Sequence, residues 1–66
     1  MNTPEHLEKI KAKCETLIAN YYSESRAVAG WRSTIAAIDS LRDMGEHDAE
    51  MLSANIITDW PEDLLL

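Results

Sequence analysis

The chain has little of what small proteins commonly use to reinforce a core. Its 66 residues include one cysteine, Cys14, so an internal disulfide framework is excluded. The two histidines and this cysteine lie far apart in the sequence, which argues against a structural zinc site. A chain of this length buries only about 60% of the surface that its unfolded form exposes. We therefore expect tight helix packing, self-association or attachment to a partner.

Glycine, proline and long apolar runs are also scarce. With two glycines, two prolines and 45% hydrophobic residues, the composition is that of a folded protein. No apolar run approaches the roughly 20 residues of a membrane span, and the first residues do not resemble a signal peptide. We expect no membrane association, and together with the free cysteine this predicts a cytoplasmic protein.

Basic residues are almost missing from the second half of the chain. Residues 1–33 carry five basic and four acidic side chains, whereas residues 34–66 carry one basic and eight acidic ones. Direct binding to nucleic acid is disfavoured, because it requires lysine and arginine at the phosphates. A protein partner with a basic surface is compatible with this charge.

Apolar residues at helical spacing predict an all-α fold. Thr3 and Pro4 indicate a helix start, and the apolar stripe from Leu7 to Tyr22 predicts a helix over 4–22. The same phase continues past Ser23–Ser25, so residues 4–44 form either one long helix or a hairpin. We favour the hairpin, because Glu24 would occupy a position on the apolar seam of the long helix and a short chain gains burial by folding back.

The remaining elements are predicted as a helix over 27–44, ended by Gly45 as its C′ residue, and a helix over 48–59 with Asp48 as its N-cap. We expect one domain, either a small three-helix bundle or a helical hairpin plus a third helix, and we expect it to be oligomeric. The core is expected to consist of Leu7, Ile10, Leu17, Trp31, Ile35, Ile38, Leu52 and Ile56.

The apolar tail 61–66 and the aromatic residues are candidates for contacts with other molecules. The three terminal leucines either fold back over the groove between the first two helices or bind a second subunit. Tyr22 and Trp60 are the aromatic residues that we select for a partner-binding face, since interfaces are enriched in such side chains.

No arrangement of residues in the sequence indicates catalysis. Cys14 has no neighbouring base, and it is interpreted as a buried apolar side chain. The stretch His47–Glu50 matches no metal motif, and its acids are explained by the start of a helix. We expect no enzymatic activity, no metal and no cofactor.

Acidic residues are the main candidates for function. Seven of them fall within residues 43–63, and no lysine or arginine accompanies them after position 43. Such charge usually keeps a surface solvated, but carboxylates on rigid helices also imitate a row of phosphates in a basic groove. The expected partner-binding acids are Asp43, Glu46, Asp48, Glu50, Asp59, Glu62 and Asp63.

Three segments resemble small accessory proteins of tailed bacteriophages and prophages. They are residues 10–15 (IKAKCE), 30–39 (GWRSTIAAID) and 56–65 (IITDWPEDLL). The resemblance implies a protein made in the bacterial cytoplasm, where small acidic proteins of this sort often inhibit host nucleases, polymerases or defence complexes. No defined activity or site belongs to these motifs, so the resemblance assigns no functional residue.

Two functions follow as hypotheses. In the first, a non-enzymatic protein uses an acidic helical face to bind and inhibit a basic host protein that handles nucleic acid. In the second, the chain forms a homodimer or higher homo-oligomer that serves as a scaffold or holds a small ligand between subunits. This assembly would depend on Tyr21, Tyr22, Trp60 and the leucine tail.

Overall fold

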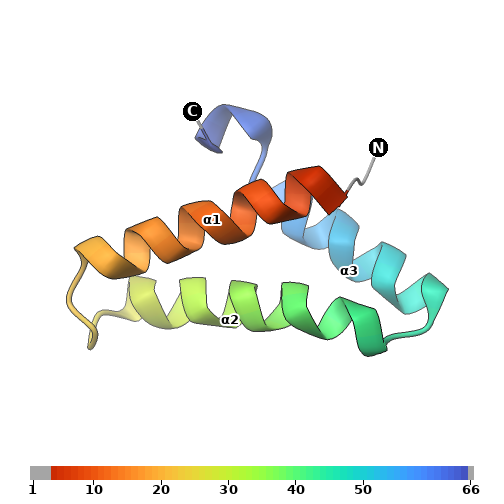
Figure 1. The fold of residues 1–66 in the computed structure, drawn as a ribbon, viewed down its shortest axis with the longest axis horizontal. Coiled ribbons are helices and arrows are strands. Elements are labelled where there is room, and N and C mark those ends of the chain that lie inside the picture. Colours follow the sequence, from red (N-terminus) through yellow and green to blue (C-terminus); the bar gives the residue numbers. More distant parts are fainter. Residues whose placement is uncertain (1–3, 66) are drawn as a thin grey trace.

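The computed structural model describes residues 4–65, and their fold is all-α, as predicted. Helices α1 (Pro4–Asn20) and α2 (Arg26–Ser40) lie side by side and antiparallel (Figure 1). Helix α3 (Glu46–Asp59) crosses behind them at the end opposite the α1–α2 loop. Two 3-10 turns, η1 (Leu41–Asp43) and η2 (Glu62–Leu65), complete the described chain. Thr3, the predicted N-cap, lies outside the described residues.

Residues 4–44 form the hairpin that we favoured, and not one long helix. The chain turns because Ser25 caps α2: its extended backbone (φ −70°, ψ 146°) places Oγ where it accepts a hydrogen bond of 3.2 Å from the Val28 N–H. Helix α1 ends at Asn20, two residues before the predicted limit. At that end the Tyr21 N–H reaches the carbonyl of Ile18, three residues back, which closes the last turn.

Removing the Ser25 cap is expected to weaken the hairpin. Ser25→Ala leaves the Val28 N–H without its side-chain partner, and loss of an N-cap of this kind costs about 1 kcal/mol. Urea unfolding followed by circular dichroism measures the change. Ser25→Asp, which keeps an acceptor oxygen, is the control and is expected to stay close to the wild type.

The junction between α2 and α3 differs from the prediction in two places. Helix α2 ends at Ser40 and continues as η1, and α3 begins at Glu46, two residues earlier than expected. Gly45 is the N-cap of α3, with φ −64° and ψ 154°, and its carbonyl accepts a 2.9 Å hydrogen bond from Ala49 N–H. The predicted roles of Gly45 as the C′ residue of the second helix and of Asp48 as an N-cap are therefore wrong.

The core lies where the three helices meet. It is a cluster of buried residues from all three: Ile10, Cys14, Ile38 and Ile56. Leu7, Trp31, Ile35 and Leu52, which we also expected in the core, pack against this cluster and are partly buried. Leu17 is partly buried nearer the α1–α2 loop. Val28, which we did not predict, is fully buried and covers the loop end of the hairpin interior.

An ion pair joins the two helices of the hairpin. Lys11 Nζ lies 2.7 Å from Asp39 Oδ1, and this hydrogen bond raises the pKa of Lys11 above its ordinary value. An exposed pair of this kind contributes little stability, although it links residues 28 positions apart in the sequence. The sequence suggests a different partner, Glu15 on the same helix, because helical spacing alone does not show what a neighbouring helix presents.

Gly30 is a site where the protein is expected to gain stability. It lies in the middle of α2, and a Cβ built on it has no atom within 4 Å. Gly30→Ala removes the entropic cost of glycine in a helix without a clash, so we expect about 1 kcal/mol more stability. Thermal and urea unfolding measure it, and an unchanged midpoint would contradict the open surroundings of this position.

Candidate acidic interface

Four acids gather where α2 passes into α3, and we call Asp43, Glu46, Asp48 and Glu50 the junction group. Asp43 ends η1, Glu46 and Asp48 lie in the first turn of α3, and Glu50 follows one turn after Glu46. All four side chains are exposed. Within residues 4–65, the one ion pair is Lys11–Asp39, so none of the four is paired with a cation.

The start of α3 explains how the fold tolerates this concentration of charge. The N-terminus of a helix carries a partial positive charge, which stabilises Glu46 and Asp48 by about 0.3–1 kcal/mol each. Glu46 and Glu50 are four residues apart, however, and like charges at this spacing repel each other. The start of α3 therefore stabilises two of the four acids, and all four remain exposed to solvent.

The other three predicted acids form a second set, the η2 group, which consists of Asp59, Glu62 and Asp63. Asp59 ends α3, and the other two begin η2. Between the two groups, residues 51–58 of α3 carry no charged side chain. Because α3 has 14 residues, its two ends lie about 20 Å apart. The seven acids therefore form two patches and not one continuous row of carboxylates.

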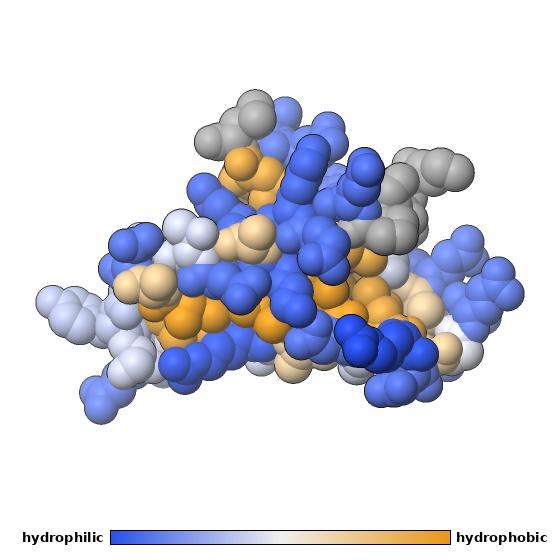
Figure 2. Space-filling view, viewed as in Figure 1, coloured by the Kyte–Doolittle hydropathy of each residue, from blue (hydrophilic) through white to orange (hydrophobic). Residues whose placement is uncertain are grey.

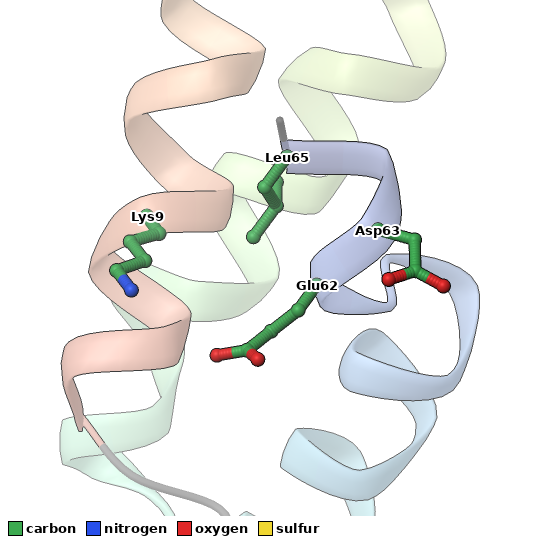
Figure 3. A pocket seen from close by; sticks show the side chains of 4 residues that line it. All are labelled: Lys9, Glu62, Asp63 and Leu65. Atoms are coloured by element: carbon green, nitrogen blue, oxygen red, sulfur yellow. The ribbon is translucent and has the colours of Figure 1, made fainter.

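The η2 group lies beside a lysine. A hollow of about 460 Å³ between α1 and η2 is lined by Lys9, Glu62, Asp63 and Leu65. Figure 3 shows Glu62 extending across the hollow towards α1, which carries Lys9, while Asp63 is turned away from that helix. Lys9 is therefore the basic residue close to the η2 group, whereas Arg42, which precedes Asp43 in η1, is the one next to the junction group.

The two aromatic residues selected for a partner face lie apart. Tyr22 is in the α1–α2 loop and is 88% exposed. Trp60 follows α3, packs partly buried against the core, and its carbonyl lies 3.3 Å from Nε2 of His6. They do not form one face. The contact between Tyr21 and Trp31, whose rings meet edge to face with centroids 5.0 Å apart, was also not predicted.

The leucine tail lies partly against the same chain. Leu65 packs on the core cluster and η2 contacts α1, whereas Leu64 is 56% exposed. Leu66 lies outside the described residues. Leu65 thus folds back onto its own chain, but in the described residues η2 contacts α1 and not α2, so it does not lie over the predicted groove between these two helices.

Cys14 is buried, as predicted, and the structure gives it no chemical role. Burial, with a smaller effect of the nearby Glu15, raises the pKa of its thiol above the ordinary value, so the unreactive protonated form dominates at neutral pH. Around His47, and elsewhere in residues 4–65, no three His, Cys, Asp or Glu side chains are grouped to hold a metal ion. None of the described helices combines the length and the apolar character that a membrane span requires.

Comparison with known proteins leaves the function to be argued from the site. No family model matches the chain, and no curated protein or solved structure matches it.

Proposed function

We propose that this protein acts by binding, and that its junction group attaches to a basic surface of a host protein. The observation that supports this proposal is the set of four exposed carboxylates within eight residues, with no cation paired to them in the described chain. A partner that supplies lysine or arginine side chains would neutralise this charge and form charge-assisted hydrogen bonds.

The junction group is a better binding surface than the η2 group for two reasons. The junction group holds four acids within eight residues beside one basic residue, Arg42, whereas two of the three acids of the η2 group share a hollow with Lys9. Three of the junction acids also lie on α3, a regular helix whose last turns pack on the core through Ile56. Their positions are thus fixed before binding, which reduces the entropy lost when the complex forms.

The class of partner follows from the charge and its arrangement. A cluster of fixed carboxylates attracts the same arginines and lysines that hold phosphates, so the expected partner is a protein that handles nucleic acid. The resemblance to small phage proteins favours a partner in a bacterial host, where occupation of its nucleic-acid site would inhibit it. No chemical step is required of the chain itself.

Capture from a bacterial lysate at two salt concentrations tests the proposal. Raising the salt from about 0.1 M to about 1 M shortens the screening length from about 10 Å to about 3 Å, so a partner held by exposed charges leaves the immobilised protein. A short DNA duplex, added at constant salt, is expected to elute the same protein. A partner that survives both treatments would contradict binding through carboxylates at a nucleic-acid site.

A further inference from the structure

The hairpin has an apolar end that no third helix covers. Helix α3 lies across the opposite end of the hairpin, as Figure 1 shows. We define the loop-end patch as the side chains with apolar surface around the α1–α2 loop, which are Leu17, Tyr21, Tyr22, Ala27 and Trp31. In Figure 2, apolar residues continue along the seam between α1 and α2 towards this end.

Helical spacing and one ring contact link four members of the loop-end patch, and Tyr22 adjoins them in the sequence. Tyr21 follows Leu17 by one helical turn, and Trp31 follows Ala27 by one turn on the other helix. The edge-to-face stack of Tyr21 on Trp31 joins the two sides. Tyr21 is 55% exposed and Tyr22 is 88% exposed, so both rings present surface to solvent close to the α1–α2 loop. Aromatic rings of this kind are enriched at interfaces.

The surface area of the chain indicates how much more it would bury in a complex. Its accessible surface is 4931 Å², whereas a compact monomer of 7.4 kDa exposes roughly 4,200 Å². The excess of roughly 700 Å² is close to the ~800 Å² that each partner buries in a standard interface. One interface on this chain would therefore bring its exposed surface down to the usual range.

The distribution of charge along the chain favours one end of the molecule for contact with a second copy. Residues 34–66 carry eight of the twelve acids, and two copies pairing through α3 would bring these acids together. The loop-end patch belongs to residues 1–33, where five basic and four acidic side chains nearly cancel. Pairing at this end also keeps the two junction groups far apart and open to partners.

We infer that the loop-end patch is a homodimer interface and that its occupant is the loop-end patch of a second copy. A two-fold axis places the same residues on both sides, so Tyr21, Tyr22 and Trp31 of each chain bury one another. The inference is independent of the proposed function, since it uses the opposite end of the molecule and a different set of side chains.

Sedimentation velocity of the whole chain over a concentration series tests the inference. The wild type is expected to reach twice 7.4 kDa. Tyr22→Glu and Ala27→Glu, both at exposed positions, are expected to weaken the dimer about 30-fold or more, the effect of losing a strong interface residue. Met51→Glu adds the same charge at a 58% exposed position on α3 and is the control, expected to dimerise like the wild type.

Circular dichroism confirms in each variant that the helices are retained, so that a loss of mass reports association. A wild type that stays at 7.4 kDa at every concentration overturns the inference, as does an assembly of three or more copies. Dimerisation that survives both loop-end substitutions, or that Met51→Glu abolishes equally, would show that the interface lies elsewhere.

Discussion

Reversing three charges of the junction group is expected to abolish capture of the partner. In the variant Glu46→Lys, Asp48→Lys and Glu50→Lys, attraction to a basic surface becomes repulsion at three positions in the first two turns of α3. We expect the affinity to fall about 100-fold or more, because each reversal is worth at least about 1 kcal/mol. The measurement is capture of the partner, with the amount bound quantified against the wild type.

The second acidic set provides a matched control. Asp59→Lys, Glu62→Lys and Asp63→Lys change the net charge by the same amount but act at the other end of α3. This variant loses the same long-range attraction, so any difference between the two reports the local contact. Equal loss of binding in both would show that the partner responds to net charge alone. Retention of binding by the junction variant would contradict the proposed site.

Ile10→Ala is expected to unfold much of the protein. Ile10 is fully buried and belongs to the cluster that joins α1 to Ile38 of α2 and Ile56 of α3. Substitutions of this kind cost about 2–5 kcal/mol. The whole chain is expected to have roughly 3–10 kcal/mol of stability at its length, so one such cavity removes much of it.

Urea unfolding followed by circular dichroism measures this loss. Leu64→Ala is the control, because Leu64 is 56% exposed and its truncation is expected to change the stability by less than about 0.5 kcal/mol. A similar midpoint for the two variants would contradict a core centred on Ile10.

Periodicity predicted the helices and most of the core, because burial along one helix follows its 3.6-residue repeat. Ile10, Ile38 and Ile56 are buried as expected, and Cys14 is the buried apolar residue that its position on the stripe indicated. For the break at Ser25, the sequence pattern allowed only a preference for a hairpin over one long helix. The heptad phase runs through it unchanged, and the cap is decided by where the Ser25 hydroxyl lies in three dimensions.

Contacts between helices were beyond the sequence pattern. Lys11 pairs with Asp39, 28 residues away, and Tyr21 stacks on Trp31 across the loop. The uncharged stretch 51–58 is visible in the sequence. That it separates the acids into two patches follows only from the structure, in which residues 46–59 form a single helix. Lys9 beside Glu62 depends on the return of the chain through η2, which no local motif indicates.

Binding of the purified partner, measured by calorimetric titration at low and high salt, tests the central claim that the junction group forms the contact. We expect tight binding by the wild type at low salt and a large loss at high salt. The junction variant should bind weakly at both concentrations, and at low salt the Asp59, Glu62 and Asp63 variant should bind more tightly than the junction variant. Salt-independent binding by the wild type, or tight binding by the junction variant, would contradict the claim.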